Sequence, residues 1–344
     1  MKMSRILPMD AVVLKGPRDA VIERVPRPDA GPLEVVVKVE ACGFCGTDLK
    51  IFEGEYLSPY PLIPGHEISG LIVSVGSNVE QSLLGTRVSV DPTLSCGTCE
   101  YCLRAEFNHC ESWGAIGDTV NGGFAEYVAV PARNIYALDS SVSYITGALT
   151  EPLACAVWAL QRMPIAPATE ALIFGAGPMG IILSTLLLKH GVMDLVIVDK
   201  SPDRLKKAAD FGITQGILKD GMDSLHQHYP SGFGLVVDAT GSPAVTENAV
   251  KWVRKAGKLL IFGVAPQGSK VSFEPYDLYH REITVYSSMA INHSYPDAVK
   301  IARQHSINWD RLVSHQMPFT EYLSAIDLVR RGKAMKIQLV APKS

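Results

Sequence analysis

The fold is decided by residues 171–199, ALIFGAGPMGIILSTLLLKHGVMDLVIVD. A short apolar run comes first, followed by a glycine-rich turn, a longer apolar run and a second short run that ends in Asp199. These lengths predict a buried strand, a buried helix and a second buried strand. Strand, helix and strand in this order are typical of an α/β domain with a doubly wound parallel sheet.

The glycine turn predicts a dinucleotide site, because Gly175, Gly177 and Gly180 match the pattern G-x-G-x-x-G. The first glycine allows the tight turn, the second lets the backbone approach a pyrophosphate, and the third lets the helix pack on the strand. The helix then presents free N–H groups to the phosphates. We expect the whole turn, including Pro178 and Met179, to contact the cofactor.

Asp199 favours NAD over NADP as that cofactor. It ends the second strand, nineteen residues after Gly180, where a carboxylate accepts hydrogen bonds from the adenosine ribose. A carboxylate in this place also repels a 2′-phosphate. Lys200 and Arg204 follow closely and could neutralise the additional charge, so NADP is the alternative. We expect all three side chains near the ribose.

Three later apolar runs, at residues 235–240, 258–263 and 283–288, predict further strands of the same sheet. Cofactors bind beyond the carboxyl ends of the strands in such sheets. The residues predicted to contact the cofactor there are Thr240, Gly263, Val264 and Ser288. Turn formation is an equal alternative for Gly241 and Ser288.

Length and composition argue against several other classes of protein, namely nucleic-acid-binding, membrane and exported proteins. The chain has 344 residues, enough for two domains, and its net charge of −3 provides no basic surplus for nucleic acid. Residues 171–188 carry no charge, but the glycines and the proline in their middle favour strand, turn and helix over a membrane span. The N-terminus lacks the apolar segment of a signal peptide, so we expect a cytoplasmic protein without membrane contact.

Four of the seven cysteines fall within residues 96–110, CGTCEYCLRAEFNHC. Seven is an odd number and nothing indicates export, so a disulfide framework is not expected. Four thiolates at this spacing can bind one tetrahedral zinc ion and leave no position for a substrate. An iron–sulfur cluster is the alternative. The predicted ligands of this structural zinc are Cys96, Cys99, Cys102 and Cys110.

A second, catalytic metal site is predicted from three separate fragments. Residues 41–50, ACGFCGTDLK, provide Cys45; residues 64–70, PGHEISG, provide His66 and Glu67; residues 150–155, TEPLAC, provide Glu151. Three ligands from this set would leave the fourth zinc position open for a substrate oxygen. The other two cysteines, Cys42 and Cys155, are interpreted as packed core thiols.

Together these features resemble the zinc-dependent medium-chain dehydrogenase/reductase superfamily. The residues that carry the resemblance are G-H-E-x-x-G at 65–70, the four-cysteine lobe, E-P-L-A at 151–154 and the glycine turn. The combination of E-P-L-A with a four-cysteine lobe looks most like the polyol branch, which includes sorbitol, arabitol and threonine dehydrogenases.

The resemblance implies two domains. Residues 1–154 and 296–344 would form a β-rich, GroES-like catalytic domain, with the structural zinc lobe at about 91–112. Residues 155–295 would form a Rossmann domain that binds NAD. Two zinc ions per subunit and a homodimer or homotetramer are also implied.

The resemblance also assigns roles to the predicted site. Cys45 and His66 would bind the catalytic zinc, with either Glu67 or Glu151 as the third ligand. Thr47 matches the family's Ser/Thr that hydrogen-bonds the alcohol and begins a proton relay. Many relatives carry His three residues after this Ser/Thr, whereas this chain has Lys50. The group that forms the outer end of the relay is therefore not assigned.

The expected reaction is reversible oxidation of a secondary alcohol of a polyol to a ketone, with hydride transfer to NAD. L-threonine 3-dehydrogenase and simple-alcohol dehydrogenase activities are the alternatives, and a non-catalytic NAD-binding redox sensor is an alternative of another class. Four side chains are weighed as pocket-lining or core residues: Phe52, Tyr56, Phe124 and Met289.

Overall fold

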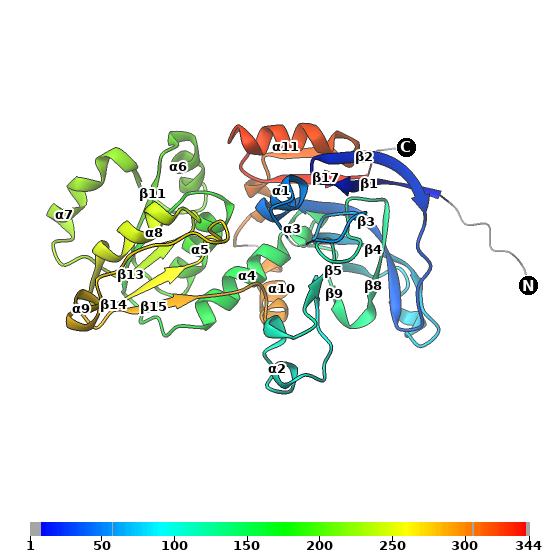
Figure 1. The fold of residues 1–344 in the computed structure, drawn as a ribbon, viewed down its shortest axis with the longest axis horizontal. Coiled ribbons are helices and arrows are strands. Elements are labelled where there is room, and N and C mark those ends of the chain that lie inside the picture. Colours follow the sequence, from blue (N-terminus) through cyan, green and yellow to red (C-terminus); the bar gives the residue numbers. More distant parts are fainter. Residues whose placement is uncertain (1–7, 57, 305, 342–344) are drawn as a thin grey trace, which may run out of the picture. The chain divides into compact units, whose positions relative to one another are not determined.

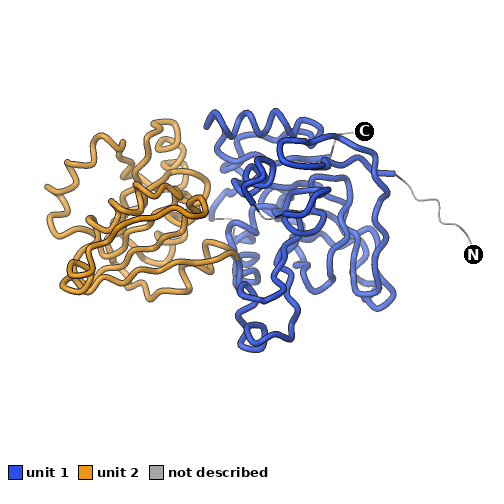
Figure 2. The backbone as a smooth tube through the Cα atoms, viewed as in Figure 1, with its two compact units in different colours: residues 1–154, 291–344 blue, residues 155–290 orange. Residues whose placement is uncertain are grey.

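The computed structural model describes residues 8–56, 58–304 and 306–341. The chain divides into two compact units, which Figure 2 shows in different colours. Unit 1 comprises residues 1–154 and 291–344, and unit 2 comprises residues 155–290. The sequence interpretation placed the return to the first domain at residue 296, whereas the contacts place it at residue 291.

Unit 2 contains a six-stranded sheet within the described residues, in the order β12-β11-β10-β13-β14-β15, and every neighbouring pair is parallel. A parallel sheet covered on both faces needs nearly continuous apolar strands, which the predicted runs provide. The strands are β10 (Glu170–Phe174), β11 (Asp194–Asp199), β12 (Gln215–Leu218), β13 (Phe233–Asp238), β14 (Val253–Ile261) and β15 (Thr284–Ser287). The edge strand β12 was not predicted, because its four residues are largely exposed.

Short helices connect these strands (Figure 1). They are α5 (Pro178–Lys189), α6 (Pro202–Ala209), α7 (Leu225–His228), α8 (Pro243–Ala249) and α9 (Pro275–His280). Four of them begin with proline, whose missing N–H is not needed in the first turn. The α5 helix lies where the apolar run after the glycine turn predicted it, and most of its residues are buried.

Unit 1 is built around a β-rich sheet with the order β16-β17-β3-β4-β5-β9, in which β8 also pairs with β3. The strands of this unit are β1 (Pro8–Gly16), β2 (Asp19–Pro26), β3 (Glu34–Phe44), β4 (Glu67–Val75), β5 (Arg87–Val90), β6 (Thr93–Leu94), β7 (Gly114–Ala115), β8 (Tyr127–Pro131), β9 (Ile135–Ala137), β16 (His315–Pro318) and β17 (Ile337–Val340). The C-terminal strand β17 pairs with β3, so the end of the chain completes a sheet begun near its start.

The helices of this unit are α1 (Gly46–Glu53), α2 (Glu100–Leu103), α3 (Tyr144–Ala148), α10 (Tyr295–Ala302) and α11 (Tyr322–Arg330), while α4 (Thr150–Gln161) contains the unit boundary. The rings of Phe44 and Phe124 stack in the core at a centroid distance of 6.0 Å, and the Tyr322 ring packs on both at a tilt, at 5.8 and 5.7 Å. Phe124 and Phe52 are both buried in this core, so core packing is the observed role for these two aromatic residues.

The predicted fold class is confirmed: a β-rich domain accompanies a doubly wound parallel sheet. In the part of the chain that the structure describes, no helix combines the length and the apolar character that a bilayer crossing requires.

Candidate functional site

Three predicted metal ligands, Cys45, His66 and Glu67, come together in unit 1. One ligand atom from each lies within 4.8 Å of the others. Strand pairing explains this, because Cys45 directly follows β3 while Glu67 begins β4, and Gly43 of β3 pairs with Glu67. His66 follows Gly65, whose positive φ of 98° allows the turn that brings the imidazole into the site.

The start of α1 fixes the backbone around Cys45. Its N–H donates to Oδ2 of Asp48 at 2.7 Å, which anchors the first turn of the helix. The Thr47 hydroxyl lies 3.8 Å from the Cys45 sulfur, so the predicted relay residue adjoins the predicted ligand. Lys50 is half-buried one turn further along α1.

Two buried carboxylates face the imidazole of His66. Its Nδ1 lies 3.1 Å from Oδ1 of Asp118 and 3.7 Å from Oδ1 of Asp48. Burial lowers the pKa of His66, but the charges of Asp118 and Asp48 outweigh it and raise the pKa well above its usual value. Burial raises the pKa of Asp48 itself to about 7. Asp118 was not predicted, because no motif connects it with a residue 52 positions earlier.

Glu67 has a cationic partner that the sequence interpretation also missed. The Lys336 ammonium donates to Oε1 of Glu67 at 2.5 Å and to the carbonyl of Phe44 at 3.1 Å. Burial lowers the pKa of Lys336, but the negative charges of Glu67, Cys45 and Glu151 raise it above its usual value. The lysine therefore stays charged inside the protein.

The residues present fit a zinc ion. A thiol, an imidazole and a carboxylate are the ligand types that zinc takes in catalytic sites, and three protein ligands leave one position open. Oε2 of Glu67 is buried and makes no hydrogen bond within the described residues, as expected of an oxygen whose partner is an ion. Glu151 is buried in the first turn of α4 and lies outside this group of three described residues.

The four-cysteine lobe forms a second group of converging ligands. The Sγ atoms of Cys96 and Cys102 are 3.9 Å apart, as are those of Cys99 and Cys110, and all four lie within 4.8 Å of one another. All seven cysteines in the described chain are free. Hydrogen bonds from Thr98 lower the pKa of Cys96 to about 6, which favours the thiolate that zinc requires.

The lobe is fastened to the segment where the chain returns from unit 2. Asn292 accepts from the Phe107 N–H at 3.1 Å and donates to the carbonyl of Ala105 at 3.0 Å. The His293 ring packs on Phe107 at a tilt, with 4.8 Å between centroids, and its Nε2 lies 3.0 Å from the Ala105 carbonyl. No sequence motif indicated these contacts, which join residues almost two hundred positions apart.

The glycine turn in unit 2 has the geometry expected of a phosphate cradle. Gly175 has a positive φ of 100°, as a tight turn requires. A Cβ added to Gly180 would lie 1.8 Å from the Gly175 carbonyl oxygen, so only glycine fits there. A Cβ on Gly177 would meet no atom of the described chain within 4 Å, which leaves the space that a pyrophosphate needs.

Asp199 lies beside that turn. Its Oδ2 accepts from the Ala176 N–H and its Oδ1 from the Ser201 N–H, both at 2.8 Å. These bonds fix the carboxylate at the strand end while each oxygen keeps acceptor capacity for a ribose hydroxyl. Lys200 is exposed and Arg204 is half-buried in the following turn and helix.

The other predicted cofactor contacts lie after three neighbouring strands, β13, β14 and β15. Thr240 donates from its hydroxyl and its N–H to the buried carboxylate of Asp238, at 2.6 and 2.8 Å. A Cβ on Gly263 would lie 2.0 Å from the Gly241 nitrogen, so two adjacent loops touch there. Val264 is largely exposed and Ser288 half-buried.

Comparison with known proteins identifies the family. Residues 31–140 match the model of the alcohol dehydrogenase GroES-like domain, and residues 178–304 match that of the zinc-binding dehydrogenases. The chain is 34% identical over 336 residues to D-arabinitol dehydrogenase 1 of Uromyces fabae, with 96% of each chain covered. It belongs to the zinc-dependent medium-chain dehydrogenase/reductase superfamily.

Two further relatives place the chain within this superfamily. D-altritol 5-dehydrogenase of Agrobacterium fabrum is 34% identical over 328 residues, which are 94% of this chain and 96% of the relative. The solved structure of a zinc-binding dehydrogenase of Sinorhizobium meliloti 1021 bound to NADP matches with a TM-score of 0.94 at 29% identity, covering 97% and 99% of the two chains. The predicted polyol dehydrogenase-like branch is therefore confirmed.

As a member of this superfamily, the chain is an NAD(P)-dependent zinc dehydrogenase with a GroES-like and a Rossmann domain. The roles of the individual site residues and the choice of NAD over NADP stay predictions. Tyr56, which the sequence analysis weighed as a pocket-lining or core residue, is influenced by the charges of the catalytic metal group. Burial raises the pKa of this half-buried phenol, and the charges of Asp118, His66 and Cys45 act on it.

Proposed function

We propose that this dehydrogenase reversibly oxidises a secondary hydroxyl of a polyol to a ketone and passes the hydride to NAD. The observation that carries the proposal is the group of the half-buried Cys45 and the buried His66 and Glu67, which offers three ligands and one open position. The relatives named for D-arabinitol and D-altritol support a polyol as the substrate.

Cys45, His66 and Glu67 would hold the catalytic zinc. Once bound, zinc supplies Lewis-acid polarisation, which makes an alcohol oxygen more acidic. Glu67 is proposed as the direct ligand because its Oε2 lacks a hydrogen bond among the described residues, whereas Glu151 lies outside the group. Glu151 would then not bind the metal directly. Its negative charge acts on the Lys336 ammonium and raises the pKa of that lysine.

Thr47 would take the hydroxyl proton of the substrate as it gives its own hydroxyl proton to the next group of the relay. Its side chain adjoins Cys45 and is half-buried, so it can reach both the substrate and the remainder of α1. Lys50 lies three residues further along the same helix, on the side that Thr47 occupies. We propose that the proton leaves along this side of α1, with Lys50 or water at its outer end.

Asp118 and Asp48 would hold the imidazole of His66 in one orientation. The negative charge of a carboxylate close to Nδ1 favours a proton on that nitrogen, which would leave Nε2 for an ion. The four-cysteine lobe would bind the second zinc ion, which makes two per subunit. Its four ligands leave no position for a substrate, so its role is structural.

NAD is proposed over NADP as the hydride acceptor. The support is Asp199, which is fixed beside the glycine turn and would repel a 2′-phosphate. The bound nicotinamide supplies the carbon that takes the hydride. The NADP-bound relative from S. meliloti shows that the fold itself accepts either cofactor.

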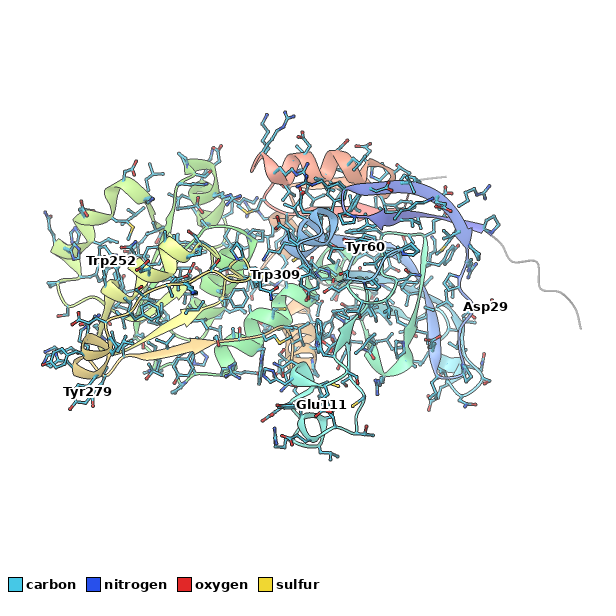
Figure 3. All side chains as sticks on the ribbon, in the orientation of Figure 1. Asp29, Tyr60, Glu111, Trp252, Tyr279 and Trp309 are labelled. Carbon is cyan, nitrogen blue, oxygen red and sulfur yellow. The ribbon has the colours of Figure 1, made fainter. Side chains whose placement is uncertain are left out.

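A homo-oligomer in the cytoplasm is proposed for the protein as a whole. The strand β15 is exposed at the edge of its sheet and offers unpaired backbone groups to a second copy. Tyr276 and Tyr279 of α9, which are 67% and 79% exposed, add apolar area next to it, and Tyr279 projects outward in Figure 3. Free thiols with zinc spacing support a reducing compartment.

A substrate screen tests the proposal. Purified enzyme is incubated with a panel of polyols, L-threonine and simple alcohols, with NAD or NADP, and NADH or NADPH formation is followed by absorbance. Zinc is counted on the same sample. Polyol-dependent NADH formation with two zinc ions per subunit is expected. Oxidation of L-threonine or simple alcohols alone, or a zinc count of one, would contradict it.

A further inference from the structure

Lys336 and Glu67 form a fully buried ion pair at the catalytic metal group. The ammonium nitrogen lies 2.5 Å from Oε1 of Glu67, and the two side chains are 6% and 1% exposed. A buried pair of this kind is costly to break, because either partner alone leaves an uncompensated charge in the interior. The two residues are 269 positions apart in the sequence, so no motif could indicate the pair.

The strand order carries Lys336 to this place. It directly precedes β17, whose first residue, Ile337, pairs with Phe44 of β3. Gly43 of β3 pairs in turn with Glu67 of β4. The Lys336 side chain therefore lies at the end of β3, where its ammonium donates to the Phe44 carbonyl and to the Glu67 carboxylate.

The two oxygens of Glu67 have different surroundings. Oε1 is taken by Lys336, while Oε2 is buried without a hydrogen bond among the described residues. Oε2 occupies space that a side chain on β3 would fill, since a Cβ on Gly43 would lie 1.8 Å from it. A buried carboxylate oxygen needs a donor or an ion, so the geometry leaves Oε2 for the metal.

We propose that Lys336 is a positioning residue, which holds Oε1 of Glu67 so that only Oε2 faces the metal. The inference rests on the proposed function in one respect, the assignment of Glu67 as a ligand. With Oε1 held, the carboxylate binds through one oxygen and the fourth position stays open for the substrate. Without the lysine, both oxygens are free to bind the ion and to fill that position.

Charge balance supports the same role. The Cys45 thiolate and the carboxylates of Glu67 and Glu151 bring three negative charges near the ammonium of Lys336. The positive charge of Lys336 offsets part of this negative charge. An uncharged residue at 336 would leave more of it unbalanced in the interior.

The test compares Lys336→Met and Lys336→Arg with Lys333→Met, an exposed control three residues away. Zinc release from each holoenzyme to a chromogenic chelator is measured, and the visible spectrum is recorded after exchange with cobalt. Lys336→Met should lose one of the two zinc ions about tenfold faster or more, with an altered cobalt spectrum. Lys336→Arg should restore both, and the control should match the wild type. Wild-type zinc retention and spectrum in Lys336→Met would overturn the proposal.

A double variant shows whether the lysine acts through Glu67. In the Glu67→Gln background, replacing Lys336 with Met should cause no further loss of zinc, because the carboxylate that it positions is gone. Additive losses would instead show an independent structural role. The double variant removes both charges of the buried pair, so it remains informative if Lys336→Met alone fails to fold.

These measurements need no substrate, so they separate the two proposals. If the wild type holds two ions but oxidises no polyol, the proposed function fails and the positioning role stands. If Lys336→Met holds its zinc and oxidises polyols with an unchanged kcat and KM, the positioning role fails and the proposed function stands.

Discussion

Oδ1 of Asp118 lies 3.1 Å from Nδ1 of His66, and neither side chain is more than one tenth exposed. The two residues come from separate loops, one before β4 and one after β7. Carboxylates in this position orient a metal-binding imidazole and increase its basicity. Asp48, at 3.7 Å from the same nitrogen, gives the ring a second and longer contact.

Asp118→Asn should weaken zinc binding at the catalytic group by about tenfold, because the amide keeps the shape of the side chain but loses its charge. Zinc release from the holoenzyme measures this directly, and NADH binding, followed by fluorescence, should stay unchanged. Asp29→Asn, at an exposed position, is the control. Equal zinc release from both variants would show that Asp48 alone orients the ring.

Asp91 should make stability depend on pH. Burial raises its pKa from 3.8 to about 6, against the opposing hydrogen bond from the Thr93 N–H. A carboxyl whose pKa is higher in the folded state stabilises the fold below its unfolded pKa, and that contribution is lost as the pH rises through about 6. At neutral pH the charge of the half-buried Asp91 therefore lowers the free energy of unfolding.

Asp91→Asn removes this charge while its amide oxygen can still accept from Thr93. The variant should be more stable than the wild type at pH 8, by on the order of 1 kcal/mol, and the difference should shrink at pH 5. Thermal midpoints at the two pH values measure it, with the exposed Asp19→Asn as control. A constant difference at both pH values would contradict the assignment.

The sequence predicted the elements whose signals are local. The glycine turn and Asp199 lie within one strand–turn–helix–strand unit, and four cysteines lie within fifteen residues, so spacing alone was informative. The partners Asp118 and Lys336 could not be found in this way. Their positions depend on the pairing of β17 with β3 and on the loop after β7, and charged residues in loops carry no periodic signal.

The predicted pocket residues show a second limit of reading a sequence, which is that core and pocket side chains look alike. Phe52 and Phe124 are apolar residues near motif residues, and apolar composition cannot distinguish a core side chain from one that lines a pocket. Both side chains are buried and contact the Tyr322 ring, which identifies them as core residues. Tyr56 is also apolar and near the motifs, yet it is influenced by the charges of the metal group.

Asn292→Ala should loosen the four-cysteine lobe. The change removes the acceptor of the half-buried Phe107 N–H and a donor to the carbonyl of the exposed Ala105, which together cost on the order of 1 kcal/mol. The expected result is a lower thermal midpoint and faster loss of the lobe zinc, with the catalytic zinc retained. Asn78→Ala, at an exposed position, is the control. Loss of the catalytic zinc first would contradict the assignment of the two ions.

Asp199→Asn should shift the cofactor preference toward NADP. The amide no longer repels a 2′-phosphate, and Lys200 and Arg204 lie close enough in sequence to pair with one. The ratio of kcat/KM for NAD to that for NADP should fall by about tenfold or more, which corresponds to about 1.4 kcal/mol of discrimination. Asp203→Asn, an exposed acidic residue in the first turn of α6, controls for the general loss of a negative charge. An equal fall in both variants would mean that the field of the whole region, and not the carboxylate at the strand end, selects the cofactor.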